Sequence, residues 1–166
     1  MKIFLSGASG FIGKHFCKEA IKDKHIIFAP SRKKANKSNK NIKWLYGDFS
    51  EDWENELADS DILIHLAAAG VNNHDLDEIF EVNVFKSLKL LKNAINYKCK
   101  NWLIISSSSE YGLRQEKKYF NFSRNTNRLP DTEYGLSKAI FTDLCLDLAK
   151  KYNCKARIMR IFSIYG

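Results

Sequence analysis

The sequence predicts a doubly wound α/β fold with a parallel sheet. Short apolar runs alternate with helical stretches over the whole chain, and these runs lack the polar alternation of half-exposed strands. A glycine-rich turn also joins the first apolar run to the first helix. With 166 residues, 45% of them hydrophobic and 28% charged, the chain has the size and balance of one globular domain, which we expect to span residues 1–166.

Six strands and three long helices are expected. The strands are Lys2–Ser6, His25–Ala29, Ile42–Tyr46, Ile62–Leu66, Trp102–Ser106 and Ala156–Phe162, and the helices are Phe11–Lys22, Leu76–Tyr97 and Tyr134–Tyr152. Pro30 is expected to stop the second strand. An apolar stripe on the last helix should dock it on the sheet: Leu136, Ile140, Leu144 and Leu148. Right-handed crossovers then predict the strand order 3-2-1-4-5-6.

Several classes of protein are excluded by composition. The longest apolar run, Ile62–Ala69, is far shorter than the ~20 residues of a membrane helix, and the apolar start breaks at Gly7, too early for a signal peptide. The four cysteines share no CxxC spacing and no pairing with histidine, so neither a disulfide framework nor a metal site is expected. We therefore expect a cytoplasmic protein with no membrane partner and no metal.

The formal net charge of +8 is concentrated in one segment. Residues 31–43 contain six basic side chains and no acid, which leaves only +2 for everything else. A nucleic-acid binder usually spreads its charge over a groove-facing element with aromatics or arginines interleaved. The simple interpretation is a solvated loop, and we expect no nucleic-acid partner.

The segment GASGFIG, Gly7–Gly13, has the spacing of a phosphate-binding turn. Glycines at these positions allow a tight turn, let backbone approach a pyrophosphate, and let the helix pack close to the strand. The helix N-terminus then offers unpaired N–H groups and a positive dipole end. The alternative is a plain turn. We expect a dinucleotide to contact this list: Gly7, Ser9, Gly10, Phe11, Ile12 and Gly13.

The end of the second strand selects the cofactor in this fold, about 20 residues past the glycines. NAD binders place an acid there, whereas this chain has Ser31 and Arg32, and no carboxylate occurs between Asp23 and Asp48. An arginine with a neighbouring serine suits a 2′-phosphate by charge and by geometry. We therefore favour NADP(H) over NAD(H). The alternative is that these residues simply begin the basic loop.

Motifs along the whole chain resemble the extended short-chain dehydrogenase/reductases, specifically the NAD(P)-dependent epimerase/dehydratase group that acts on nucleotide sugars. The motifs are Gly7–Gly13, Gly47-Asp48, His65–Ala68, Asn83-Val84, Ser106–Gly112 and Tyr134–Lys138. The resemblance implies a Rossmann-type domain with a nucleotide-sugar substrate. It adds these cofactor contacts: Asp48, Phe49, Leu66, Ala67, Ala68, Asn83, Tyr134 and Lys138.

The resemblance also implies a catalytic set of Ser107, Tyr134 and Lys138. Tyr134 and Lys138 lie at i and i+4 on one helix, so they should project side by side. The tyrosine pKa of about 10 is too high for proton exchange at neutral pH, and we expect the lysine ammonium to lower it. Four consecutive serines leave the register of the catalytic serine open by one, with Ser108 as the second choice.

Two departures from the family pattern limit the reaction. Dehydratases carry Asp-Glu directly after the catalytic Ser/Thr, where this chain has Ser108 and Ser109, with Glu110 one position late. Sugar dehydration is therefore disfavoured. The segment Arg160–Gly166 resembles the one that leads into the family's smaller substrate-binding portion. We expect the chain to be the N-terminal part of a longer enzyme, and to bind a dinucleotide with negligible turnover by itself.

These residues suggest three functions. The first choice is reduction of a nucleotide-linked 4-keto-6-deoxysugar, because an NADP(H) preference suits a reductase. Nucleotide-sugar epimerisation uses the same three side chains and is the alternative within the enzyme class. The alternative of another class is a non-catalytic NAD(P)-binding module. Apolar surface left uncovered by the missing portion would also favour self-association into a homodimer.

Overall fold

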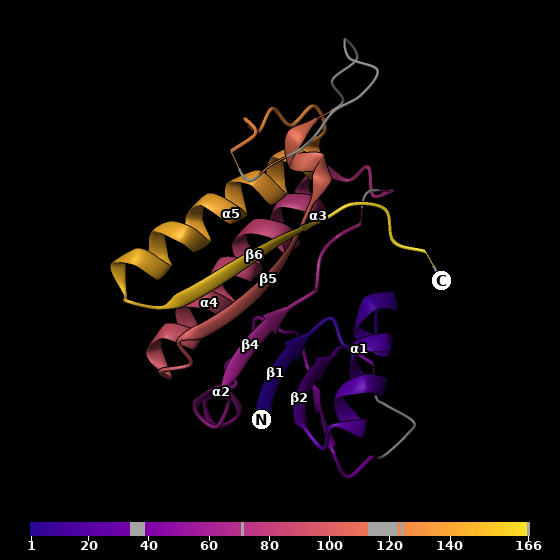
Figure 1. Cartoon of the computed structure of the whole chain (residues 1–166), viewed down its shortest axis with the longest axis vertical. Coiled ribbons are helices and arrows are strands. Elements are labelled where there is room, and N and C mark those ends of the chain that lie inside the picture. Colours follow the sequence, from indigo (N-terminus) through magenta and orange to yellow (C-terminus); the bar gives the residue numbers. More distant parts are fainter. Residues whose placement is uncertain (34–38, 71, 113–122, 124, 166) are drawn as a thin grey trace.

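The chain folds around one parallel sheet (Figure 1). The structure is a computed structural model and describes residues 1–33, 39–70, 72–112, 123 and 125–165. These residues form six strands in the order β3-β2-β1-β4-β5-β6, and every neighbouring pair is parallel, which confirms the predicted fold class and strand order. The strands are β1 Lys2–Ser6, β2 Ile26–Ser31, β3 Ile42–Tyr46, β4 Ile62–His65, β5 Asn101–Ser107 and β6 Lys155–Ile161.

In the described part of the chain, helices follow β1, β3, β4 and β5. They are α1 Phe11–Lys22, α2 Glu54–Ala58, α3 Leu76–Phe80, the π-helix η1 Glu81–Lys86, α4 Ser87–Asn96, the 3-10 helix η2 Ser108–Tyr111 and α5 Glu133–Lys151. The single helix predicted from Leu76 to Tyr97 is therefore interrupted by a π-helical turn. The short helices α2 and η2 were not predicted, since neither is long enough to show a helical period.

The prediction that Pro30 stops the second strand was wrong. β2 continues through Pro30 to Ser31 and pairs with β3 over that stretch. The N–H of Ile27 donates toward β3, so the alternation of the backbone turns the nitrogen of Pro30 toward β1. The pairing of β2 with β1 ends at Phe28, so the missing N–H of Pro30 costs no bond there.

Alternate residues of β1 face opposite sides of the sheet and begin two hydrophobic cores. Ile3 and Leu5 pack with residues of α1, whereas Phe4 packs with residues of α2, α4 and α5. Figure 1 shows α1 on one side of the sheet and α4 and α5 on the other. The inner strands β2, β1, β4 and β5 are therefore mostly buried, as their continuous apolar runs predict, whereas the edge strands β3 and β6 are partly exposed.

Helix α5 docks on the sheet with a different face from the predicted apolar stripe. Leu136, which we placed in that stripe, is 43% exposed. The buried face carries Lys138, Phe141, Thr142 and Cys145 instead. Two of these are polar and have partners in the core, so a hydrophobicity count cannot find this face.

Three helix-to-strand turns share one geometry. Helices α1, α4 and α5 each end in a residue with positive φ: Lys24 at 58°, Lys98 at 64° and Asn153 at 52°. In each turn the next N–H donates back to an alanine carbonyl five residues earlier, at 3.0, 2.9 and 2.8 Å: His25 to Ala20, Cys99 to Ala94 and Cys154 to Ala149. This is the helix ending that usually contains glycine at the left-handed position.

Candidate active site

The turn between β1 and α1 brings three backbone segments into close approach. Gly7 has φ +77°, and a Cβ there would lie 2.7 Å from the backbone nitrogen of Ala67, beyond β4. A Cβ on Gly13 would overlap the carbonyl oxygen of Gly7. Only glycine fits at both positions, so α1 begins directly against the ends of β1 and β4.

The N-terminus of α1 opens at this turn. Gly10 is the N-cap and provides no side-chain cap, so the N–H groups of Phe11, Ile12 and Gly13 have no partner within the helix. Backbone donors and the positive end of the helix dipole therefore point to the same place. An anionic phosphate group suits both.

Two adjoining hollows meet at the turn and share Gly7, Gly10 and Leu66. The first, of about 300 Å³, extends over the ends of β2 and β3 and is lined by Ser9, Pro30, Ser31, Arg32, Gly47, Asp48, Phe49, Ala67, Ala68, Ala69, Glu78 and Val82. The second, of about 320 Å³, extends the other way and is lined by Phe11, Ile12, Gly13, Ser107, Tyr134, Ile161, Phe162 and Ile164. Together they form a cleft with a phosphate-binding turn at its centre. A dinucleotide, with one nucleoside on each side of a pyrophosphate, fits this layout.

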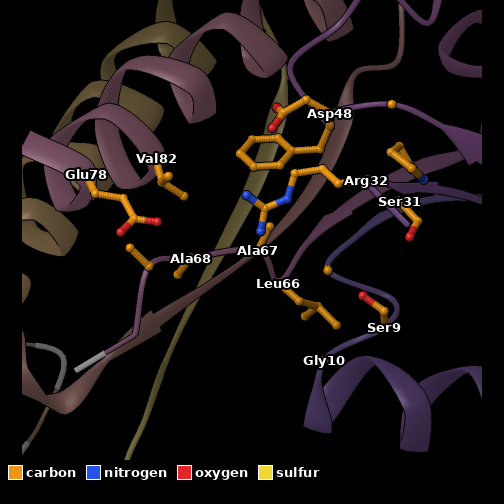
Figure 2. A pocket seen from close by; sticks show the side chains of 15 residues that line it. Ser9, Gly10, Ser31, Arg32, Asp48, Leu66, Ala67, Ala68, Glu78 and Val82 are labelled. Atoms are coloured by element: carbon orange, nitrogen blue, oxygen red, sulfur yellow. The ribbon is translucent and has the colours of Figure 1, made fainter. Parts of the chain in front are cut away.

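Arg32 lies inside the first hollow. Figure 2 shows its guanidinium pointing across the hollow toward Ala67, with Ser31 beside it at the end of β2. The rest of the predicted basic loop includes residues 34–38, which lie outside the described residues. A cation in this position can meet an anionic group on the adenosine side of a bound dinucleotide.

Asp48 lines the same hollow and is already engaged. Its Oδ1 accepts from the backbone and hydroxyl of Ser50 at 3.0 and 2.8 Å, and its Oδ2 pairs with Lys86 Nζ at 3.2 Å. Burial opposes its ionisation, but these bonds outweigh burial and hold the pKa of Asp48 below its usual value. Lys86 thus places a second cation near this end of the cleft.

Ser107 and Tyr134 meet at the other end of the cleft. Ser107 is the last residue of β5, and it lines the second hollow together with Tyr134. Ser107, and not Ser108, is among the residues that line this hollow. Burial raises the pKa of Tyr134, and the Ser107 side chain only partly offsets this rise.

The lowered tyrosine pKa that we predicted is not found, because Lys138 is directed elsewhere. Its Nζ donates to the carbonyl of Ile105 at 2.8 Å, and Lys138 is not among the residues that line the cleft. Burial lowers the pKa of Lys138 to about 8, against an opposing attraction to Glu110. The ammonium therefore lies behind the tyrosine, in the wall of the cleft.

Asn83 supports the site from behind the cleft surface. It lies in η1, is 1% exposed, and its Oδ1 accepts from the N–H of Ala69 at 2.7 Å. Its Nδ2 donates to the Ala69 carbonyl and to Ser137 Oγ, which in turn donates to the carbonyl of Tyr134. The amide thus ties the loop after β4 to α5 and does not line the cleft, where we predicted a cofactor contact.

His65 is a buried bridge that the sequence did not reveal. Its Nδ1 lies 2.6 Å from Ser6 Oγ on β1, and its Nε2 lies 2.9 Å from Ser87 Oγ on α4. Burial, and to a smaller extent the charge of Lys138, lower the pKa of His65 to about 3. The ring is therefore neutral at pH 7 and joins the two central strands to the helix behind them.

A cluster of charges around Glu110 was also missed. We call it the Glu110 cluster: the fully buried carboxylate bonds with Ser106 Oγ, with Thr142 Oγ1 at 2.7 Å, with Arg128 Nη1 at 3.3 Å and with Arg160 Nε at 2.7 Å. Its members come from β5, η2, α5, β6 and the loop before α5. A lone acid after a serine-rich strand end was the only sequence signal.

The cleft also contains residues that the sequence analysis did not assign. Glu78 and Val82, one helical turn apart, line the first hollow, and Phe162 and Ile164 line the second. In Figure 1 the chain beyond β6 turns toward α1, which brings these last residues to the cleft. No group of histidine, cysteine, aspartate or glutamate within the described residues could hold a metal ion. No helix in this part of the chain is long and apolar enough to cross a membrane.

The sequence of this chain matches a known protein family, in agreement with the fold and the cleft. The sequence profile of the NAD dependent epimerase/dehydratase family matches residues 3–166. The chain belongs to this family. The short-chain dehydrogenase/reductase resemblance of the motifs and the Rossmann-type fold are thereby confirmed.

Related proteins match this chain over its whole length. An uncharacterized UDP-glucose epimerase from Bacillus subtilis is 30% identical over 100% of this chain and 57% of its own length. A CDP-abequose synthase from Salmonella typhimurium is 31% identical over 99% of this chain and 53% of its own. The solved structure of UDP-glucuronic acid 4-epimerase from Bacillus cereus in complex with NAD is 26% identical, with TM-score 0.87 over 100% of this chain and 58% of that one. The chain thus spans just over half the length of these relatives.

Proposed function

We propose that this family member takes part in nicotinamide-linked hydride transfer at a sugar carbon that carries a hydroxyl or keto group, in a nucleotide sugar. One observation carries the proposal. Tyr134 and Ser107 both line the hollow at one end of a cleft whose centre is the glycine turn, so a proton donor lies beside the place where a dinucleotide fits. The dinucleotide would supply the hydride donor or acceptor when bound.

The chain's own residues would handle the proton and the orientation. The Tyr134 hydroxyl gives its proton to the sugar oxygen as a carbonyl becomes a hydroxyl, and takes it back in the reverse direction. The Ser107 hydroxyl hydrogen-bonds the same oxygen and fixes its position. Lys138, with a pKa of about 8, is mostly an ammonium at neutral pH, but it bonds the Ile105 carbonyl, and Tyr134, whose pKa is raised by burial, stays protonated as a donor must.

Water elimination is not part of the proposal. Ser108 and Ser109 stand where dehydratases carry acids, and Glu110 is fully buried with two arginine partners. A carboxylate fixed in this way has no access to a substrate in the cleft. This supports the expectation that sugar dehydration is disfavoured.

Two reactions fit the catalytic side chains. Reduction of a nucleotide-linked 4-keto-6-deoxysugar is the first candidate. Arg32 in the first hollow supports it, because an arginine there suits NADPH, and NADPH is the usual reductant. Epimerisation is the second, supported by the relatives, two of which are described as nucleotide-sugar epimerases. A reductase consumes reduced cofactor in proportion to product, whereas an epimerase shows no net change in cofactor.

The test compares the protein with its Tyr134→Phe variant. Each is incubated with UDP-glucose, or with a dTDP-linked 4-keto-6-deoxyhexose and NADPH, while product and reduced cofactor are followed together. Loss of the proton donor should lower turnover by about 10²–10⁴-fold. Tyr46→Phe is the matched control, because Tyr46 is 68% exposed and lies outside the cleft lining.

The outcomes separate three possibilities. Turnover that falls only in Tyr134→Phe supports the proposed chemistry. Unchanged turnover in that variant contradicts it. Because residues 1–166 alone are expected to turn over negligibly, turnover is compared in this chain and in a longer protein that contains it. Cofactor binding by calorimetry without turnover of any nucleotide sugar in either one favours the non-catalytic NAD(P)-binding module instead.

A further inference from the structure

The Glu110 cluster connects the elements that carry the catalytic side chains. Ser106, which donates to the Glu110 carboxylate, directly precedes the catalytic serine on β5. Thr142, the second hydroxyl donor, lies one helical turn after Lys138 on α5. Arg160 extends the connection to β6, one residue before the part of the chain that lines the second hollow. One carboxylate thus holds three walls of the cleft at fixed positions.

The same carboxylate lies close enough to Lys138 for its charge to act on the lysine. Lys138 Nζ is anchored on the carbonyl of Ile105, the neighbour of Ser106, so both groups use adjacent residues of β5. The charge of Glu110 raises the pKa of Lys138 against the larger effect of burial. Other titratable groups around Lys138 are Tyr134, one turn earlier on its own helix, His65 from β4, and Arg128, which donates to the carbonyl of the adjoining Ala139. None of the three is an anion at neutral pH.

Burying a carboxylate completely is costly, so the cluster needs an explanation. Two guanidinium groups and two hydroxyls compensate the charge of Glu110. A hydrophobic residue at this position would avoid the desolvation cost, but it would leave Lys138 buried with no opposite charge facing it. A buried, unbalanced ammonium loses its proton.

We propose that Glu110 is a positioning residue, whose anchored carboxylate holds β5 against α5 and provides the negative charge that keeps the buried Lys138 an ammonium. Its importance for turnover rests on the proposed function, but its effect on the lysine does not. The second part of the proposal can therefore be measured without a substrate.

The experiment follows the titration of Lys138 by NMR of the protein with isotopically labelled lysine. The Lys138 signal is assigned by its absence from Lys138→Arg. In Glu110→Gln the carboxylate charge is lost while the shape is kept, so the midpoint of the Lys138 titration should fall by roughly 1 pH unit. A merely structural role would leave this midpoint unchanged in a folded protein.

Asp143→Asn is the matched control. Asp143 pairs with Arg128 on the exposed side of the cluster and does not contact Glu110, so the same loss of charge there should leave the midpoint where it is. Arg128→Gln provides a second reading if Glu110→Gln does not fold. Removing this cation leaves the field of Glu110 less opposed, so the midpoint should rise, a sign that loss of structure does not produce.

Each outcome decides the proposal. A lowered midpoint in Glu110→Gln, or a raised one in Arg128→Gln, with Asp143→Asn unchanged, supports it. Equal midpoints in all folded variants overturn it. A midpoint that responds as expected, when neither this chain nor a longer protein that contains it turns over a nucleotide sugar, would leave the effect of Glu110 on Lys138 standing and refute the proposed function alone.

Discussion

At the scale of single residues, Arg32 is the side chain that sets the expected cofactor preference. Its guanidinium lies inside the first hollow (Figure 2), where it could bind the 2′-phosphate of a cofactor. We expect tighter binding of NADP(H) than of NAD(H), and Arg32→Ala should remove about 10–100-fold of that preference, the worth of one hydrogen bond to a charged group. Isothermal titration with both cofactors measures the ratio.

The neighbouring Lys33 provides the control for this prediction. It is exposed and carries the same charge, but it does not line the hollow. Lys33→Ala should therefore preserve the preference. Equal affinities for the two cofactors in the unsubstituted protein would show that Arg32 is only the start of the basic loop.

His65 makes the protein sensitive to mild acid. Its pKa is about 3 in the folded chain, whereas an unfolded histidine titrates near 6.5, so below pH 6.5 protons bind preferentially to the unfolded state. This contribution to stability is complete above pH 6.5 and declines as the pH falls toward 3. It should lower the free energy of unfolding by about 2 kcal/mol between pH 7 and pH 5.

Urea unfolding at both pH values checks this expectation. In His65→Gln the decrease attributable to this ring should vanish, although the variant is less stable at every pH because two buried hydroxyls lose their partner. His74→Gln, a change at an exposed position, should retain the decrease. A wild-type slope that persists in His65→Gln would assign the acid sensitivity to other groups.

The roles of residues that show a pattern along the chain could be predicted from the sequence. The roles of residues whose partners lie far away in the sequence could not. The glycine turn and the pair Tyr134–Lys138 follow from spacing along the chain. The direction of the tyrosine pKa did not, because burial raises it and the lysine ammonium bonds to a carbonyl of β5 instead. Glu110 was noticed only for its position, since its four partners are spread from Ser106 to Arg160.

At the scale of elements, the π-helical turn η1 places Asn83 where three segments meet. Its amide satisfies both backbone groups of Ala69 and the hydroxyl of Ser137, all in a buried environment. Asn83→Leu keeps the volume but leaves these groups without a partner. We expect a loss of about 2–4 kcal/mol in the free energy of unfolding.

Denaturant titration of Asn96→Leu supplies the comparison. Asn96 ends α4 on an exposed position, so the same substitution there should change stability by less than about 0.5 kcal/mol. Similar losses in both variants would mean that the amide of Asn83 adds nothing beyond helix propensity.

Elements with a strong apolar period were predictable, whereas their interruptions were not. β1, α1 and β3 have the predicted bounds. Pro30 was misjudged because its effect depends on where the neighbouring strand stops pairing, which is a tertiary property. The π-helical turn leaves the apolar stripe of the long helix intact, so hydrophobicity alone gives no sign of it.

At the scale of the whole molecule, the strand order explains where the cleft lies. β1 is flanked by β2 and β4, so the connections leaving β1 and β4 run to opposite sides, and a crevice opens at their carboxyl ends. The glycine turn follows β1 and the Ala67 segment follows β4, which places both at this crevice. The order could be predicted because right-handed crossovers leave few alternatives.

The three left-handed helix endings lie at the amino ends of the strands, on the opposite side of the sheet from the cleft. Their conformation affects the stability of the whole domain. Each of these endings contains a residue with a side chain where glycine would avoid steric cost. Lys24→Gly and Lys98→Gly should each raise the free energy of unfolding by about 1 kcal/mol, and Asn153→Gly by less, since asparagine tolerates this conformation. Lys22→Gly, inside the last turn of α1, should lower it by a similar amount.

Combining these changes tests which of these turns respond independently. Lys24 precedes β2, whereas Lys98 and Asn153 precede β5 and β6, whose first residues pair with each other. The gains of Lys24→Gly and Asn153→Gly should therefore add, within about 0.5 kcal/mol. Those of Lys98→Gly and Asn153→Gly should not, because a change in one turn alters the backbone against which the other is built. A double-mutant cycle of Lys98→Gly and Asn153→Gly would thus measure the coupling energy between these two turns. The pair Lys24→Gly and Asn153→Gly serves as the reference.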